Sequence, residues 1–158
     1  PESLWEQVKS FMLEDIKSFK MGGVEDFTNF VNAVIDESSF PIVNIRFTGS
    51  KSTDQNFQSY LDQTKACYNQ RKPLAIIFDA SQASIPGLSH QKMQANWLKE
   101  NEALMKNFCA GTAYIIPNAA IRGILKMIFS FQKQPVPYKI VETETEALGW
   151  VQGLDRIK

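Results

Sequence analysis

The spacing of apolar residues predicts an amphipathic helix at the start of the chain. From Ser3 to Phe19, apolar residues recur every three or four positions and charged residues fill many of the places between them. Ser3 opens a capping-box sequence, and Gly22-Gly23 is a typical helix stop. We therefore interpret residues 1–22 as a helical extension and residues 23–158 as one domain.

Two β-branched apolar runs then predict a β-hairpin. The runs extend from Phe30 to Ile35 and from Pro41 to Phe47, and the polar segment Asp36–Ser39 separates them. A short polar connection between two such runs favours antiparallel pairing.

Three later segments predict the rest of a sheet. Leu74–Phe78 and Ala113–Ile116 are apolar at every position, which is typical of parallel strands buried on both faces. Pro135–Val141 contains prolines, which cannot donate to a strand ladder, so we expect it at an edge.

Four further helices are predicted between and after these strands. Thr53 and Asp54 can cap the first, Ser89 the second and Asn118 the third, and the terminal helix is expected from Thr143 to Val151. The helix from Ser89 is expected to run without a break to Phe108. Strands that alternate with helices predict an α/β fold with right-handed crossovers. We expect about five strands, mostly parallel, with an antiparallel hairpin at the N-terminal edge.

Composition narrows the classes of function. The chain has 158 residues, and 17 basic residues balance 17 acidic ones, so the formal net charge is zero. A neutral molecule has no overall field to hold a polyanion, and nucleic acid is not an expected partner. No apolar run approaches the length of a membrane span, so we expect a cytoplasmic protein without a membrane span.

The cysteines and the histidine do not suggest catalysis. Cys67 and Cys109 stand far apart and outside any C-x-x-C pattern, so we expect small core residues in a reducing compartment, with no metal and no cofactor. His90 is the only histidine, and it follows Ser89 directly. Adjacent helical residues point in different directions, so we expect an exposed first-turn residue rather than a Ser-His pair.

Several segments together carry a family resemblance. They are Ile42–Gly49, Ile76–Asp79, the helix around Trp97, Ala113–Pro117 with Ile121–Gly123, and Glu144–Val151. With these segments, the chain from about Phe30 to Val151 resembles a bacterial family of STAS-like domains. That family is related in fold to the SpoIIAA anti-sigma-factor antagonists and to the CRAL-TRIO lipid carriers. The resemblance implies a regulatory domain that binds a protein partner and has no enzyme activity.

The chain departs from the antagonists at one turn. Their phosphorylated serine lies in an Asp-Ser-Ser-Gly-like turn after the third strand, whereas the matching segment Asp79–Ser89 is longer and lacks that tetrapeptide. Partner switching by serine phosphorylation is therefore not predicted. Only their position in this segment makes Ser84 and Ser89 candidate sites of phosphorylation.

The carboxyl ends of the two inner strands are the predicted binding site. Ligands of open α/β sheets bind at such ends, where helix N-termini present free N–H groups. The candidate ligand-binding residues are Asp79, Ser84, Ser89, Asn118 and Arg122. In one interpretation, Arg122 and the amides after Asn118 hold a small anion. In the other, which we favour, Asp79 pairs with Arg122 and Asn118 caps its helix.

A surplus of soft and aromatic side chains leaves a second possibility open. The residues are Phe11, Met12, Phe19, Phe27, Phe129 and Phe131. They would line a lipid-sized cavity or a partner surface, although ordinary core packing is the commoner role of such residues. The N-terminal helix would cover a sheet face of its own chain or of a second copy, which suggests a homodimer. The main hypothesis is a regulatory domain with a protein partner, and the alternative is a carrier or sensor of a small amphiphilic or anionic ligand.

Overall fold

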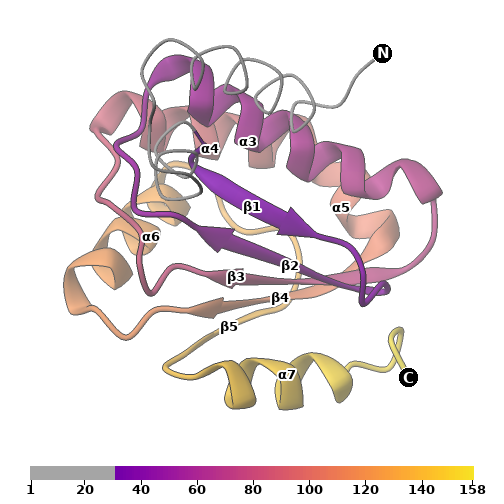
Figure 1. Ribbon diagram of the computed structural model, residues 1–158. Helices are drawn as coiled ribbons and strands as arrows, with labels where there is room; N and C mark the ends of the chain where they lie inside the picture. The colour runs from indigo at the N-terminus through magenta and orange to yellow at the C-terminus, as the bar shows by residue number, and fades with distance from the viewer. Residues whose placement is uncertain (1–30) are drawn as a thin grey trace, which may run out of the picture.

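A five-stranded sheet organises the protein (Figure 1). The computed structural model describes residues 31–158. The strands are β1 (Ala33–Asp36), β2 (Ile42–Phe47), β3 (Leu74–Asp79), β4 (Cys109–Ile115) and β5 (Tyr138–Val141), and they lie side by side in chain order. β1 pairs antiparallel with β2, and all other pairs are parallel. The α/β prediction with an edge hairpin is confirmed, whereas the predicted helix over residues 1–22 lies outside the described residues.

The helices follow the strands as the caps indicate. They are α3 (Asp54–Ala66), α4 (Leu88–Glu100), α5 (Glu102–Phe108), α6 (Ala119–Phe131) and α7 (Glu144–Gln152), and a 3₁₀ turn, Cys67–Gln70, extends α3. The Thr53 hydroxyl accepts from the backbone N–H of Asn56 at 3.1 Å. The backbone N–H of Thr53 in turn donates to the side-chain Oδ1 of Asn56 at 2.8 Å. The predicted caps Thr53 and Asn118 are confirmed, and Thr143, the predicted start of the terminal helix, is its N-cap.

The order of the strands explains where the helices lie. Each parallel strand is the immediate neighbour of the one before it, so right-handed crossovers carry every connecting helix over the same face. Figure 1 shows α3, α4, α5 and α6 on one side of the sheet and α7 alone on the other. The helix-rich face therefore carries the larger core and α7 the smaller one.

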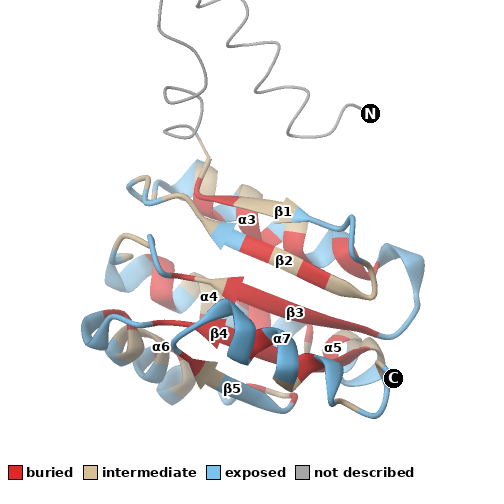
Figure 2. Ribbon diagram, turned by 60° about the horizontal axis from the view of Figure 1, so that its bottom comes forward, coloured by how far each residue is buried: buried red, intermediate tan, exposed pale blue. Residues whose placement is uncertain are grey.

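Alternate residues of the inner strands serve these two cores. Ile76 and Phe78 of β3 belong to the larger core, and Ala75 and Ile77 to the smaller one. Figure 2 shows β3 and β4 buried along their lengths and α7 lying across them. The sequence predicts that the N-terminal helix covers one face of the sheet. Helix α7 covers the inner part of the face opposite α3, α4, α5 and α6.

The long helix predicted from Ser89 to Phe108 is wrong in two respects. It begins at Leu88 with Gly87 as its N-cap, so Ser89 is not the cap. It also breaks at Asn101, whose backbone N–H and side-chain Nδ2 both donate to the carbonyl of Trp97, the latter at 2.9 Å. A side chain that competes in this way for helix carbonyls favours termination, and α5 starts at the next residue.

β4 begins at Cys109, four residues before the predicted Ala113. The added residues are small, and the reason lies in their packing. A Cβ on Gly111 would lie 3.0 Å from side-chain atoms of Leu154 and Trp150 and 3.1 Å from the carbonyl of Pro137. The first half of β4 therefore lacks the bulky apolar residues that predict a strand. Its residues are small because α7 and the segment after α7 pack directly on the β4 backbone.

Within residues 31–158, no helix has both the length and the apolar character needed to cross a bilayer.

Gly111→Val tests the packing of α7 on β4. The added side chain would displace Trp150 or Leu154, and overpacking of this kind lowers the free energy of unfolding by about 1–3 kcal/mol. Gly123→Ala on α6 is the control, because nothing lies within 4 Å of its Cβ position. We expect it to raise stability by about 0.5–1 kcal/mol through helix propensity. Urea unfolding measures both, and an unchanged stability of Gly111→Val would contradict the described packing.

Candidate functional site

The predicted strand-end residues do not assemble into one site. Oδ1 of Asp79 accepts from the amide and hydroxyl of Ser81, at 3.0 and 2.6 Å. The Ser84 hydroxyl donates to the carbonyl of Ser50 at 2.8 Å. Ser89 is exposed in the first turn of α4. These three side chains thus serve separate local structures.

Asn118 and Arg122 both stabilise the junction between β4 and α6. Asn118 Oδ1 accepts from the amides of Ala120 and Ile121, at 2.7 and 3.3 Å, so the predicted cap is confirmed. Arg122 Nη1 donates to the carbonyls of Ile116 and Pro117, both at 3.0 Å. Two amides that would hold an anion are therefore already engaged.

The expected Asp79–Arg122 pair is wrong for a geometric reason. Asp79 follows Ile77 by two positions on β3, so it points to the face that α7 covers. Arg122 comes from α6, which lies on the opposite face. Sequence proximity to two neighbouring strand ends did not reveal that the two side chains lie on different sides of the sheet.

Arg122→Ala tests this structural role. Losing the bonds to the two carbonyls should lower the free energy of unfolding by about 0.5–1.5 kcal/mol. Inorganic phosphate should shift the melting temperature of the wild type and of the variant equally, because Asn118 already occupies the helix amides. Thermal melts with and without phosphate measure this. A phosphate-dependent stabilisation that only the wild type shows would restore the anion hypothesis.

A cavity lies between the sheet and helices α3, α4 and α6, with an unfilled volume of about 100 Å³. Its sheet wall is formed by Ile76, Phe78, Thr112, Tyr114 and Ile116. The helices add mainly apolar and aromatic side chains, which include Phe57, Trp97, Leu98, Ile121, Ile124, Leu125, Ile128 and Phe129. The space is partly open to solvent rather than a closed void in the core.

The cavity includes part of what the sequence indicated. Ser84 lines it, and so does Phe129. Phe131 is instead 43% exposed. The other members of the predicted apolar group, Phe11, Met12, Phe19 and Phe27, lie outside the described residues.

Three buried tyrosines give the cavity a polar side. The Tyr60 hydroxyl binds Gln94 Oε1 at 2.9 Å, and the Tyr114 hydroxyl accepts from Gln134 Nε2 at 2.8 Å. Tyr68 is 2% exposed, and within residues 31–158 its hydroxyl has no nitrogen or oxygen partner but lies beside the Cys109 thiol. Burial is the main cause that raises the pKa of all three phenols above the ordinary value, so they stay protonated at neutral pH.

Two of these tyrosines lie in segments that the apolar pattern had already marked as core. Tyr60 lies on the predicted core face of its helix, and Tyr114 lies within an all-apolar strand. A buried tyrosine usually finds a partner for its hydroxyl. Only the fold shows that these three side chains border one cavity.

His90 is buried, so the expectation of an exposed residue is wrong. Its Nε2 lies 2.8 Å from Oδ1 of Asp54, and its ring stacks on Phe57 with 5.2 Å between centroids. The first turn of α4 packs against the first turn of α3, which encloses the imidazole. His90 therefore joins two helices that border the cavity.

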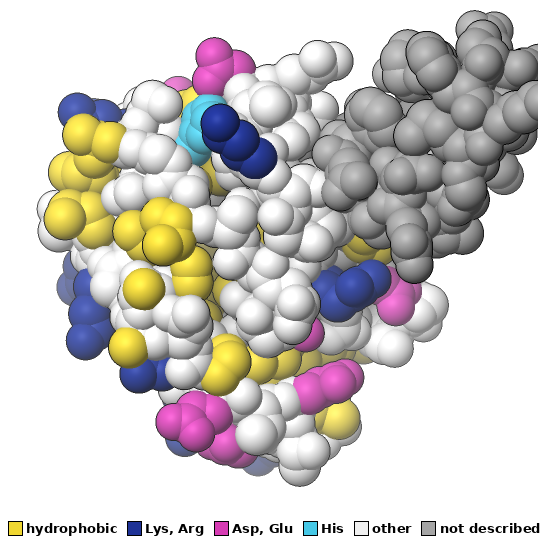
Figure 3. Space-filling model, turned by 60° about the vertical axis from the view of Figure 1, so that its left-hand side comes forward, with side chains coloured by type: hydrophobic (Ala, Val, Ile, Leu, Met, Phe, Trp, Pro, Cys, Tyr) yellow, Lys and Arg dark blue, Asp and Glu magenta, His cyan; other side chains and the backbone are white. Residues whose placement is uncertain are grey.

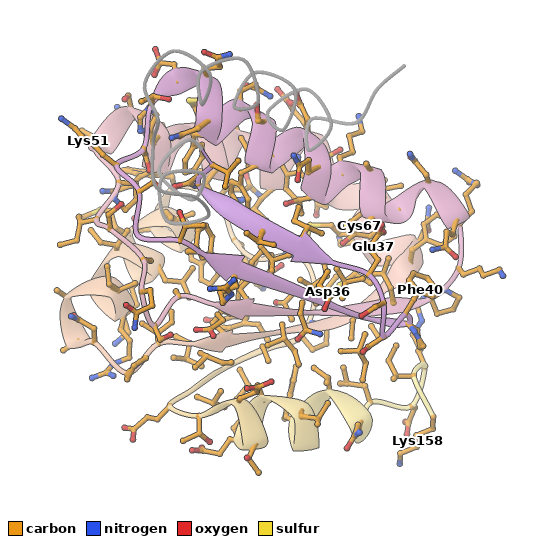
Figure 4. All side chains as sticks on the ribbon, in the orientation of Figure 1. Asp36, Glu37, Phe40, Lys51, Cys67 and Lys158 are labelled. Carbon is orange, nitrogen blue, oxygen red and sulfur yellow. The ribbon has the colours of Figure 1, made fainter. Side chains whose placement is uncertain are left out.

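The two cysteines are buried core residues, as predicted. Burial is the main cause that raises the pKa of the Cys67 thiol to about 12, and the Glu37 carboxylate near it in the β1–β2 turn adds to the rise (Figure 4). Burial likewise raises the pKa of Cys109 to about 11. Both thiols thus stay protonated and poorly nucleophilic. In the part of the chain that the structure describes, no three His, Cys, Asp or Glu residues are grouped as metal ligands.

Comparisons with known proteins give short local matches. No family model matches the chain. It is 41% identical over 66 residues to the mitochondrial delta-1-pyrroline-5-carboxylate dehydrogenase of Dictyostelium discoideum, a match over 42% of this chain and 9% of that protein. It is 49% identical over 41 residues to the dehydrogenase of the same name from Danio rerio, over 25% of this chain and 7% of that protein. The matches thus span less than a tenth of the length of these relatives.

Proposed function

We propose that this chain is a non-enzymatic binding domain that holds a small, mainly apolar molecule between its sheet and helices α3, α4 and α6. The observation that carries the proposal is the unfilled cavity, with apolar walls and a few convergent hydroxyl and amide groups. Such a lining is characteristic of small-molecule sites. The dehydrogenase activity in the relatives' names is not part of the proposal, because the matches span only 7–9% of those proteins.

The cavity volume limits the size of the ligand. A dry apolar cavity of about 150 Å³ is known to hold benzene. The space here is smaller, about 100 Å³, but it is not fully enclosed. The proposal is therefore a sensor or carrier of a single small ring or short chain, rather than of the long-chain lipids that the CRAL-TRIO resemblance suggests.

The loops at the carboxyl ends of the strands are the proposed entrance. Gly49 and Ser52, which follow β2, and Ser84 and Pro86, which follow β3, line the cavity. Ligands of open α/β sheets approach from this end. Figure 3 looks onto this side of the molecule, where hydrophobic side chains gather near the surface.

A protein partner is the second candidate function, and the β3–α4 loop favours it. Ile85 is 60% exposed and Leu88 is 55% exposed, although both are large apolar side chains. Ser84 and Pro86, on either side of Ile85, line the cavity. A loop that contacts both the cavity and solvent is suited to report occupancy to a partner, in keeping with the regulatory role that the STAS-like resemblance implies. A cytoplasmic location and a homodimer through residues 1–22 remain predictions.

Ile124→Trp tests whether the cavity is the binding site. Ile124 lines the cavity from α6, so the larger indole should fill that space and weaken toluene binding at least about tenfold. Lys126→Trp, the same substitution at an exposed position of α6, is the matched control and should leave toluene affinity unchanged. Titration calorimetry gives the Kd of each protein.

Toluene that fails to bind the wild type, or binds both tryptophan variants equally, would refute the cavity proposal. Native mass spectrometry of protein purified from its host separates the two functions. A retained small molecule supports the sensor or carrier. A chain without a small molecule but with a bound protein supports the partner role alone.

A further inference from the structure

We infer that the outer surface of α4 and α6 binds a second copy of this chain, which docks with the exposed side of its α7. We call this surface, formed by Leu88, Lys92, Lys126, Met127 and Phe131, the basic face. The inference goes beyond the cavity and does not depend on it. It also differs from a homodimer through residues 1–22, because both contact surfaces belong to the described residues.

Exposed apolar side chains lie close together on the basic face. Leu88 and Lys92 are one turn apart on α4, and Met127 and Phe131 are one turn apart on α6. The two helices pack against each other, and Lys92 Nζ lies 5.9 Å from the centroid of the Phe131 ring. Leu88, Met127 and Phe131 are all exposed. Single exposed apolar side chains are common, but a group of them on adjacent helices marks an interaction surface.

The charged residues around these side chains are all positive. Residues 80–99 and 116–141, which cover α6 and α4 up to Lys99, contain no Asp or Glu. Their cations are Lys92, Lys99, Arg122, Lys126, Lys133 and Lys139. Within residues 31–158, no carboxylate forms an ion pair with any of them. Figure 3 shows Lys and Arg side chains beside hydrophobic ones on this side of the molecule. The neutral chain therefore has a local positive field on this face.

Helix α7 has the complementary charge and an exposed apolar residue. From Glu142 to Asp155 the chain has four acidic residues and no Lys or Arg. Glu144 and Leu148 are one turn apart on α7, and both are exposed. Among the described residues, no ion pair involves Glu142, Glu144 or Glu146. Carboxylates in a first turn also stabilise their own helix, but that role does not require an exposed leucine one turn later. The surface of α7 thus matches the basic face in charge and in apolar character.

The fold keeps the two surfaces apart within one chain. Helices α4 and α6 cover one face of the sheet and α7 covers the other (Figure 1). A chain therefore cannot bring its own α7 to its own basic face, whereas a second copy can. Because the two contact surfaces differ, the contact is head-to-tail and adds copies in a row or a ring. Salt screens exposed charges, so the association should weaken as the salt concentration rises.

Two double variants each reverse the charge of one surface. Lys92→Glu with Lys126→Glu changes the basic face, and Glu142→Lys with Glu144→Lys changes the α7 surface. Analytical ultracentrifugation measures the mass against protein concentration. The wild type should exceed the single-chain mass of 17.9 kDa at about 0.05 M salt and approach it at about 0.5 M salt. Each double variant alone should self-associate at least about tenfold more weakly, because like charges then face each other.

An equal mixture of the two double variants gives the sharpest readout. The lysine variant keeps its α7 surface and the glutamate variant keeps its basic face, so one contact can form between them. The mass should rise to that of two chains and no further, which also shows that both variants are folded. Lys65→Glu with Lys72→Glu is the matched control, because it changes the net charge equally at exposed positions on α3 and before β3. It should associate like the wild type.

Several outcomes would overturn the inference. A wild type that keeps the mass of one chain at low salt would do so, as would a mixture that stays monomeric or an equal loss of association in the control. If the wild type is monomeric, sedimentation with phosphatidylserine vesicles would assign the basic face to an anionic bilayer, and binding of poly-glutamate to an acidic partner protein. Neither double variant changes a residue that lines the cavity, so toluene affinity should stay unchanged in both. The proposed function and this inference therefore fail separately.

Discussion

Right-handed crossovers between neighbouring parallel strands are the constraint on which the structure depends. Because β2, β3, β4 and β5 follow one another across the sheet, the helices that connect them must share one face. On that face, the strand side chains pack against α3, α4 and α6 and form the larger core. Within residues 31–158, the other face is covered by α7, which packs close enough to require Gly111 at its contact with β4. The face with four helices leaves room for a cavity, whereas α7 packs directly on the backbone of β4 on the other face.

The chemistry of the cavity follows from the side chains that this arrangement brings together. β4 contributes Thr112 and Tyr114, which lie on the same face of the sheet because they are two positions apart. Tyr60 and Tyr68 come from α3 and its 3₁₀ extension, and apolar residues of α4 and α6 close the space. Side chains from separate segments thus border one mainly apolar space, and none of its described lining residues is charged. The exposed Ile85 in a loop that also lines the cavity connects this site with the surface.

The fold was largely predictable because its signals are local. Continuous apolar runs identified β3 and β4 as inner strands, and Thr53, Asn118 and Thr143 identified helix starts through bonds to amides only a few residues away. The errors arose where tertiary contacts decide. Asn101 ends α4, the packing of Trp150 on Gly111 allows a strand of small residues, and the contact of α4 with α3 buries His90. The candidate site shows the same limit, since sheet faces separate Asp79 from Arg122 and only the fold gathers the tyrosines.

The most direct test of the account is a crystal structure of the protein under xenon pressure, because xenon enters dry apolar cavities without needing a polar partner. The account predicts xenon density between the sheet and helices α3, α4 and α6, in contact with Phe78, Trp97 or Ile121. A core in which side chains fill that space, with no xenon between the sheet and these helices, would contradict it.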